Sequence, residues 1–583
     1  MSYPLQRPYS TPANSTVLLP LLLLSLARQR HSPKTATNIR TEYDFVIVGA
    51  GSAGSVVANR LSEISCVNVL LLEAGPPPSI LTEVPGFTRE ASFTNLDWNY
   101  VTTPQKNTGR GIIGRQFLYP RGKALGGTSI MNGMVYIRGN KHNYDEWEAQ
   151  GATGWSYKDV LPYFKKMEDN RNVDVVSNGY HGVGGPVTVE RPWYRGEVKI
   201  PLIKSAIELG YHFRDVNGQL QTGFNDHQAF MRDGQRCSTA KAYLVPAENR
   251  TNLHILPNAM VRKVIIKNKR AVGVLFDHSG DTYEVRATRE VILSAGAINT
   301  PQILMLSGVG PRKELERHKI KVEADLHVGM NLQDHIGPTQ EFVTDASIPT
   351  YAEKLRDPNN LVYEQVYEPY ENKPLITCLV YLLQPISRGR VTLYSTNPYD
   401  APLIDPNYFS DPRDLYSVVE GLKSCNRIGK GSYLKALGFQ PISTLFPGCE
   451  KYASNQELYF RCQARTSVIP LYDAVGTAKM GNPADPSTVV DPYLRVKLIK
   501  GLRVVDASIM PIIPSGNINA PTIMIGEKAS DIIKSSIQCE EYDNNEPEYD
   551  DDFATYEYKK AAERAENRAY RIPKYNSRQF RGI

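Results

Sequence analysis

The stretch Tyr43-Asp-Phe-Val-Ile-Val-Gly-Ala-Gly-Ser-Ala-Gly54 decides the fold of this 583-residue chain. The apolar run at residues 45–48 is typical of a buried parallel strand. Gly49, Gly51 and Gly54 then follow in G-x-G-x-x-G spacing. In such a turn the first glycine allows a tight bend and the second lets a pyrophosphate approach the backbone. The third lets the next helix pack against the strand.

A second strand and an acidic residue complete the pattern. Residues 55–62 are typical of a helix whose N-terminus would point at phosphate. The apolar run 67–72 predicts the next parallel strand. Glu73 follows it, about 20 residues after Gly54, where a carboxylate accepts from a ribose 2′-OH. This order of elements predicts an α/β domain that binds an adenine dinucleotide, and by itself it fits NAD as well as FAD.

Composition narrows the class of protein. Hydrophobic residues make up 41% of the chain and charged residues 22%, as in an ordinary soluble globular protein. The formal net charge of +6 is small for this length, and no stretch interleaves basic with aromatic residues as a nucleic-acid-binding surface does. We therefore expect no nucleic-acid partner.

The first 40 residues are typical of a targeting segment. Arg7 precedes an apolar run at 17–26, and Ser25 and Ala27 form a small-x-small cleavage pattern. The run is too short to span a bilayer. We interpret residues 1–40 as a signal peptide and leader of a secreted protein. The alternatives are a disordered leader and an uncleaved anchor.

The seven cysteines give little structural information in the sequence. They are scattered too widely to predict a disulfide scaffold or a metal site, and their odd number leaves at least one unpaired within the chain. Cys449 and Cys462 are close enough in sequence to be candidates for a local disulfide.

A glycine-rich stretch from Arg121 to Gly139 carries the first resemblance to a known family. Its glycines, with Thr128 and Ser129, predict a loop that offers backbone N–H groups to a ligand. The stretch resembles the first signature of the glucose–methanol–choline (GMC) oxidoreductases, which are FAD enzymes. A second signature is matched at 296–310.

Further blocks extend the resemblance over residues 41–534. One lies at 328–335, and the other consists of 501–511 together with 516–522, in the family's order. The wording of these motifs is closest to the insect glucose-dehydrogenase-like group. With four ordered blocks, the predicted cofactor becomes FAD.

The resemblance implies an α/β fold in which a Rossmann-like FAD-binding domain is combined with a discontinuous α+β substrate domain. The expected divisions are the GMC N-terminal region at 41–337, a substrate-domain segment at 338–385 and the GMC C-terminal region at 386–535. The interval between His335 and Arg388 is short for the family, so we expect the substrate domain to be reduced. Apolar residues at helical spacing predict helices at 159–168 and 199–209, and alternating apolar residues predict paired strands at 253–266 and 271–276.

Residues 536–583 have a different composition. Residues 540–557 are strongly acidic, residues 559–581 are basic, and tyrosines are spread through both. Such a segment cannot bury a core, so a disordered charged tail is predicted, with a short helix at 559–570. The alternative is a docking or cross-linking tail.

The cofactor site follows from the resemblance. FAD is expected to be bound noncovalently, because Met131 stands where some relatives carry a flavin-linking histidine. The expected FAD-binding residues are Gly49, Gly51, Ser52, Ala53, Gly54, Glu73, Gly127, Thr128, Asn132, Gly133, Met134, Val135, Val261, Asp506, Ala507, Asn519 and Thr522.

The catalytic motif departs from the family. An alcohol must lose a proton from oxygen and a hydride from carbon, and a family histidine assists the proton transfer. Here Asp473 occupies the histidine position and Asn519 the second catalytic position. A carboxylate, with an ordinary pKa of about 3.9, is a weaker base. Its charge would also oppose a reduced flavin unless Asp473 is protonated. We interpret His335 as structural or flavin-facing.

Two functions remain open from the sequence. The first is an FAD-dependent oxidoreductase that oxidises the CH–OH group of an alcohol or sugar and passes electrons to oxygen or a quinone. The second is a catalytically impaired, FAD-binding secreted protein, which Asp473 and the short substrate half favour.

Overall fold

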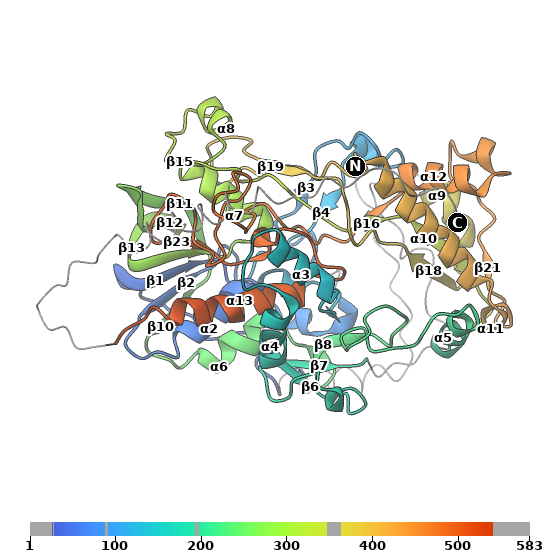
Figure 1. Cartoon of the computed structure of the whole chain (residues 1–583), viewed down its shortest axis with the longest axis horizontal. Coiled ribbons are helices and arrows are strands. Elements are labelled where there is room, and N and C mark those ends of the chain that lie inside the picture. Colours follow the sequence, from blue (N-terminus) through green and yellow to red (C-terminus); the bar gives the residue numbers. More distant parts are fainter. Residues whose placement is uncertain (1–25, 27, 88–90, 193–196, 347–362, 540–583) are drawn as a thin grey trace, which may run out of the picture.

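The computed structural model describes residues 26, 28–87, 91–192, 197–346 and 363–539 (Figure 1). Of the predicted signal peptide and leader (1–40), residues 1–25 and 27 lie outside the described residues, and so do residues 540–583 of the predicted tail (536–583). So does the short helix predicted at 559–570.

A seven-stranded sheet forms the core of the cofactor half. Its order is β10-β2-β1-β13-β12-β11, with β23 beside β13. β1 runs parallel to β2 and to β13, as the buried apolar run predicted. The strands are β1 (Glu42–Val48), β2 (Val69–Leu72), β10 (Leu253–Leu256), β11 (Ala259–Lys267), β12 (Arg270–His278), β13 (Asp281–Leu293) and β23 (Leu502–Val504).

Helices α2 (Ser52–Leu61) and α13 (Asn519–Lys534) lie side by side against this sheet (Figure 1). α2 begins three residues before the predicted helix, directly after Gly51. The two helices approach closely because α13 presents Gly526, where a Cβ would lie 2.9 Å from the Cβ of Val56. The first and last parts of the fold are thus packed together.

The predicted helices at 159–168 and 199–209 are confirmed as α4 (Tyr157–Met167) and α5 (Lys199–Glu208). The predicted strand at 253–266 is two strands, β10 and β11. Pro257 and Asn258 interrupt it, and Asn258 takes a positive φ of 53°. β10 therefore pairs with β2 and β11 turns to pair with β12.

The substrate half is built from separate small sheets. One has the order β5-β8-β7-β6 with β9 beside β8, and another has the order β18-β17-β21. Its strands are β5 (Val135–Tyr136), β6 (Glu168–Asn170), β7 (Val187–Glu190), β8 (Gln228–Arg232), β9 (Gln235–Arg236), β17 (Thr339–Val343), β18 (Leu375–Leu379) and β21 (Gln440–Pro441). The short 338–385 interval thus supplies two antiparallel strands.

Helices α10 (Pro412–Gly429) and α12 (Gln456–Thr466) cover the end of the molecule away from the seven-stranded sheet (Figure 1). The remaining helices are α3 (Lys141–Ala149), α6 (Val245–Ala247), α7 (Gly296–Leu306), α8 (Arg312–Arg317), α9 (Tyr363–Val366) and α11 (Ser432–Lys435). The remaining strands are β3 (Tyr100–Val101), β4 (Leu118–Tyr119), β14 (Val309–Gly310), β15 (Ala324–Asp325), β16 (Ile336–Gly337), β19 (Arg390–Thr392), β20 (Leu403–Asp405) and β22 (Ile469–Pro470).

The cysteines form three disulfides, so the prediction that they are too scattered for a disulfide framework is wrong. Cys449 and Cys462 are bonded, as their spacing suggested. The other pairs are Cys378–Cys425 and Cys66–Cys539, and the last joins residues 473 positions apart. Spacing along the chain did not predict these pairs because the fold, not the sequence, makes the cysteines neighbours. Cys237 is free and buried.

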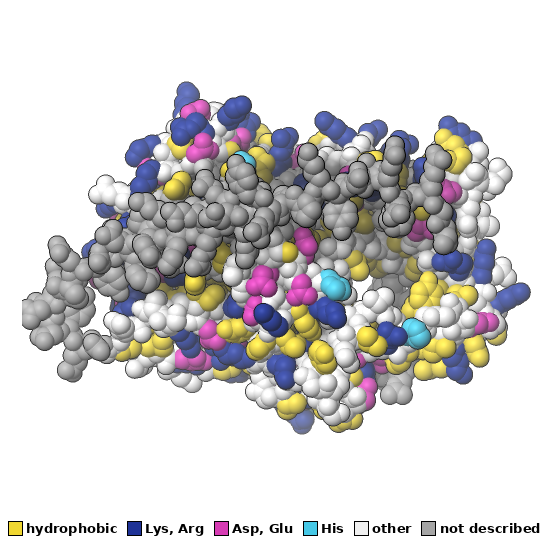
Figure 2. Space-filling view, in the orientation of Figure 1, with side chains coloured by type: hydrophobic (Ala, Val, Ile, Leu, Met, Phe, Trp, Pro, Cys, Tyr) yellow, Lys and Arg dark blue, Asp and Glu magenta, His cyan; other side chains and the backbone are white. Residues whose placement is uncertain are grey.

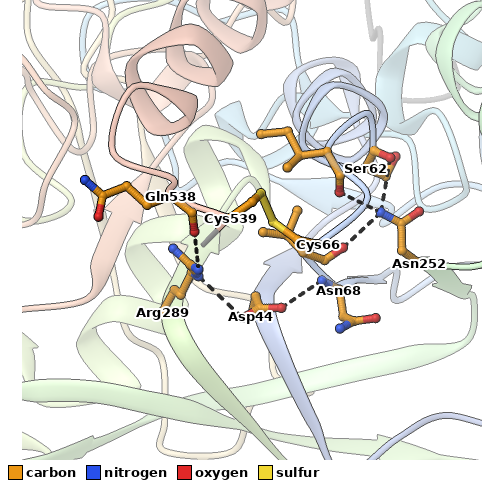
Figure 3. Close-up of a disulfide and its surroundings, with 10 residues drawn as sticks. Asp44, Ser62, Cys66, Asn68, Asn252, Arg289, Gln538 and Cys539 are labelled. Carbon is orange, nitrogen blue, oxygen red and sulfur yellow. Dashed lines mark hydrogen bonds and ion pairs between the residues drawn. A yellow bond between two sulfur atoms is a disulfide. The ribbon is translucent and has the colours of Figure 1, made fainter. Parts of the chain in front are cut away.

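The Cys66–Cys539 bond fixes the end of the described chain to the cofactor half (Figure 3). Beside it, Arg289 donates to the carbonyl of Gln538 and pairs with Asp44, at 3.4 Å in each case. Asp44 in turn accepts from the backbone N–H of Asn68.

Candidate active site

A cavity of about 1200 Å³ extends from the cofactor half to the small sheets of the substrate half. It lies at the carboxyl ends of β1 and β2, where ligands bind in open α/β sheets. Every residue predicted to bind FAD lines this cavity except Gly54. Asp473 and Asn519, the predicted catalytic residues, line it as well.

The three glycines of the first turn have different surroundings. A Cβ at Gly49, whose φ is +99°, would lie 2.5 Å from the carbonyl oxygen of Ser294. A Cβ at Gly54 would lie 1.9 Å from the carbonyl oxygen of Gly49. At Gly51, by contrast, no atom approaches closer than 4.0 Å. The open space at Gly51 faces the cavity and fits a group that touches the backbone there, as a pyrophosphate does.

Two long helices begin at the cavity wall. α2 begins at Ser52 and α13 at Asn519, and both residues line the cavity. No acidic residue occupies the first turn of either helix. The unsatisfied N–H groups and the positive ends of the helix dipoles favour an anion at this place. The residues present therefore fit the diphosphate of FAD.

Glu73 is buried at the end of β2 and has a double role. Its Oε2 accepts from the N–H of Ala50 and its Oε1 from the N–H of Gly75, both at 2.9 Å. Burial raises the pKa of Glu73 to about 7, although these two backbone bonds oppose the rise. Glu73 thus shapes the turn that it also borders, and each oxygen keeps a lone pair for a ribose hydroxyl.

Asp506 joins β23 to the start of α7. It accepts from the N–H of Gly296 at 2.8 Å, from the hydroxyl of Thr300 at 2.6 Å and from the N–H of Ser508 at 2.8 Å. Burial raises the pKa of Asp506. Because the carboxylate is fixed from both sides, the backbone of Ala507 is held in the cavity wall.

Asp473 has a partner that the sequence did not reveal. Its Oδ2 lies 2.9 Å from Nδ1 of His335, and Nε2 of the same ring lies 3.2 Å from the carbonyl oxygen of Leu383. His335 is fully buried, whereas 11% of the Asp473 side chain is exposed, toward the cavity. An imidazole thus lies directly behind the carboxyl group of Asp473.

Asp334 holds the loop that carries Asp473. Its Oδ1 accepts from the N–H of Asp473 at 2.6 Å, and its Oδ2 accepts from the hydroxyls of Tyr119 at 2.7 Å and Tyr408 at 2.6 Å. Burial, with a further contribution from the charge of Asp473, raises the pKa of Asp334 to about 6. The residue before Asp473, Tyr472, has a positive φ of 63°.

Asn519 is oriented by the cofactor half. Its Oδ1 accepts from the hydroxyl of Ser52 at 2.7 Å. This bond joins the first residues of α13 and α2, and it leaves the amide NH₂ of Asn519 for a ligand in the cavity. Both predicted catalytic positions thus present polar groups to one space.

Six residues that carry hydroxyl groups border the part of the cavity away from the glycine turn. They are Thr339, Tyr367, Thr377, Tyr381, Ser467 and Tyr472. Apolar side chains such as Leu379 and Ile469 lie between them. Such a wall suits a small polar molecule with hydroxyl groups of its own.

Other kinds of site are not found in the described part of the chain. No group of His, Cys, Asp and Glu residues there could hold a metal ion, and no helix there is long and apolar enough to cross a membrane. On the face drawn in Figure 2, basic side chains are dispersed among acidic and uncharged ones.

Comparison with known proteins identifies the family of this chain. GMC oxidoreductase family models match residues 43–337 and 385–526. The chain is 39% identical to glucose dehydrogenase [FAD, quinone] of Drosophila pseudoobscura pseudoobscura, over 85% of this chain and 87% of that one. It is 37% identical to alcohol dehydrogenase [acceptor] of Pseudomonas putida, over 86% and 97%.

A solved structure agrees with the fold. Pyridoxine 4-oxidase from Mesorbium loti superposes with a TM-score of 0.73 and 28% identity, covering 85% of this chain and all of that one. Fold and site define an oxidoreductase with a dinucleotide cofactor in the cavity described above. The chain belongs to the GMC oxidoreductase family, whose cofactor is FAD.

Proposed function

We propose that this protein oxidises the CH–OH group of a small alcohol or sugar to a carbonyl, with FAD as hydride acceptor. The observation that carries this proposal is the single cavity that joins the FAD-type glycine turn to a wall of hydroxyl groups, with Asp473 and Asn519 on its surface. The named activities of the two relatives, glucose and alcohol dehydrogenation, support the same substrate class.

Each catalytic residue has a distinct task in this reaction. When bound, FAD supplies the site that takes up the hydride. Asp473 accepts the hydroxyl proton of the substrate. The amide of Asn519 donates to the substrate oxygen, which holds the alcohol in one orientation. Arg121 steadies the loop by donating to the carbonyl of Tyr472.

The electron acceptor and the location belong to the same proposal. A quinone is the acceptor favoured by the resemblance to glucose dehydrogenase [FAD, quinone], with oxygen as the alternative. Secretion is supported by the three disulfides, since such bonds persist in oxidising compartments. The leader pattern at residues 1–40 supports it as well.

The test is anaerobic reduction of the purified holoprotein. A panel of alcohols, polyols and sugars is added without oxygen, and the main visible absorbance band of the flavin is followed. We expect at least one member of the panel to bleach the band, and added quinone to restore it. A band that no member bleaches, although dithionite does, would favour the alternative of an impaired FAD-binding protein.

Noncovalent binding is tested on the same sample. Met131 offers no imidazole for a covalent bond, so acid precipitation should release all of the flavin into the supernatant. Flavin retained in the pellet would contradict noncovalent binding.

A further inference from the structure

His335 faces hydrogen-bond acceptors on both sides of its ring. Nδ1 lies 2.9 Å from a carboxylate oxygen of Asp473, and Nε2 lies 3.2 Å from the carbonyl oxygen of Leu383. A carbonyl oxygen cannot donate, so Nε2 must carry a proton to bond there. A neutral imidazole has one N–H only. If Nε2 carries it, a second proton must lie between Nδ1 and Asp473 for that contact to be a hydrogen bond.

The pair therefore holds two protons in either arrangement. The first arrangement is an imidazolium beside a carboxylate, and the second is a neutral imidazole that accepts from a protonated carboxyl group. The net charge is zero in both. Removal of one proton would leave a ring nitrogen lone pair against an oxygen in a fully buried place, which is costly.

We propose that His335 and Asp473 act as one proton-holding unit, in which His335 cancels the negative charge that Asp473 would otherwise place in the cavity. His335 is a positioning residue, since it is not part of the cavity wall, and Asp473 is the catalytic member. The unit supplies from two residues what the family's histidine supplies from one.

The charged groups around His335 and Asp473 are bonded to other partners, so they do not change the number of protons that the pair holds. Asp334 already accepts from three donors, namely the N–H of Asp473 and the hydroxyls of Tyr119 and Tyr408. It therefore does not compete for the proton of His335. Arg121, the nearest fixed positive charge on the cavity wall, is engaged with the carbonyl of Tyr472.

The pair also defines where the substrate proton goes. His335 engages Oδ2 of Asp473, and within the described part of the chain no side chain or backbone group bonds to Oδ1. The alcohol would give its hydroxyl proton to Oδ1, and FAD, when bound, would take up the hydride, so that the alcohol carbon would lose two electrons. The pair would then carry a positive charge, which would favour negative charge on the cofactor.

The charge pairing can be measured without any substrate. Sulfite adds to oxidised flavins as an anion, and its affinity rises with positive charge near the ring. At pH 8.5, His335→Gln leaves the Asp473 carboxylate uncompensated, so we expect the sulfite dissociation constant to rise by at least about tenfold. Asp473→Asn should stay within about threefold of the wild type, because an unpaired buried imidazole is neutral at this pH.

The double variant shows whether a loss of sulfite affinity in His335→Gln comes from the uncompensated charge of Asp473 or from a disturbed structure. His335→Gln combined with Asp473→Asn removes both charges, so sulfite affinity should return to within about threefold of the wild type. A His335→Gln protein with unchanged affinity, or a double variant as weak as His335→Gln, would overturn the proposal. His318→Gln is the matched control, since that ring also faces a backbone carbonyl, of Leu393 at 3.2 Å, but lies outside the cavity.

A second measurement needs no variant of His335. In holoprotein labelled with ¹⁵N-histidine, Nε2 of His335 should be bonded to hydrogen in both arrangements, because it faces the carbonyl oxygen of Leu383. A ring whose Nε2 carries no hydrogen would overturn the pairing.

The proton step rests on the proposed function, whereas the charge pairing does not. If alcohol oxidation is absent but the sulfite and ¹⁵N results hold, only the proposed function fails. If oxidation is present, Asp473→Asn should slow flavin reduction at saturating alcohol by about a hundredfold or more while its sulfite affinity stays near normal. A rate close to that of the wild type would remove Asp473 from the proton step.

Discussion

The two halves of this molecule hold their functional groups by different means. In the cofactor half, the cavity wall includes a glycine turn, two helix N-termini and a loop, whose backbone groups are placed around one seven-stranded sheet. In the substrate half, the wall consists of side chains carried by small sheets, and two disulfides, Cys378–Cys425 and Cys449–Cys462, tie that half together.

This difference explains how substitutions are expected to act in each half. A backbone site depends on conformation, which a short local pattern specifies, so substitutions there act on folding or on cofactor binding. A side-chain site depends on partners far apart in sequence. Asp473, which we expect at the position of the family's histidine, has its imidazole partner His335 138 positions earlier in the chain.

The largest effect on folding and cofactor binding is expected at two glycines of the first turn, one needed for packing and the other for binding FAD. Gly54→Ala would place a Cβ 1.9 Å from the carbonyl oxygen of Gly49, so we expect loss of the folded cofactor half. Gly51→Ala, with 4.0 Å of free space, should fold but bind FAD weakly. Circular dichroism and flavin content measure the two effects. A folded Gly54→Ala protein that merely lacks FAD would contradict this division of roles.

In the substrate half, the largest effect is expected at Glu341 on β17. This side chain is fully buried, and burial raises its pKa to about 7 from an unfolded value of about 4.3. Stability therefore falls as pH rises from about 4.3 to 7. Above pH 7 the buried charge costs about 3 kcal/mol.

Glu341→Gln removes this titration. At pH 8 we expect β17 and β18 to open with a free energy up to about 3 kcal/mol higher than in the wild type, and at pH 5 with a similar one. Hydrogen exchange of the two strands measures it. Equal protection of both proteins at pH 8 would show that the Glu341 charge is compensated.

Substitution of Glu73 tests whether FAD binding in the cofactor half also depends on a side chain. Glu73→Ala removes a charge-assisted bond to ribose worth about 1.5–3 kcal/mol, so FAD affinity should fall ten- to a hundredfold. Titration of apoprotein with FAD measures this change. Because Glu73 also accepts from Ala50 and Gly75, Glu73→Gln, which can keep one of these bonds, should lose less. Unchanged FAD affinity in both variants would mean that Glu73 stabilises the turn only and does not bind ribose.

The same contrast separates what the sequence could predict from what it could not. The parallel strands, helix α2 and the glycine turn follow from local spacing and apolar runs, because each needs only neighbouring residues, whereas the other expected FAD-binding positions came from the family resemblance. The partners of Asp473 and of Cys66 lie 138 and 473 positions away. No period or spacing encodes such pairs, and the family signature at 328–335 identified His335 without its contact.

The break between β10 and β11 was missed for a different reason. Alternation of apolar residues continues through Pro257 and Asn258, so the pattern indicates one strand. The pattern records only which residues are buried. Here the chain leaves a parallel neighbour for an antiparallel one without changing its buried face.

The smallest effect on the reaction rate is expected at the hydrogen bond that joins the glycine turn to the predicted catalytic residue Asn519. The hydroxyl of Ser52, in the backbone-built turn, donates to Oδ1 of Asn519 at 2.7 Å. Ser52→Ala removes a hydrogen bond worth about 1 kcal/mol, and the amide of Asn519 loses its fixed orientation. We expect flavin reduction at saturating alcohol to slow by about two- to tenfold, with FAD content unchanged.

Ser530→Ala is the control, because that hydroxyl also lies buried on α13 and bonds the carbonyl of Gly526, away from the cavity. The decisive comparison uses Asn519→Ala as the background. If Ser52 acts by orienting Asn519, then Ser52→Ala should add no further slowing once Asn519 is alanine. Equal slowing in both backgrounds would instead mean that Ser52 acts independently of Asn519.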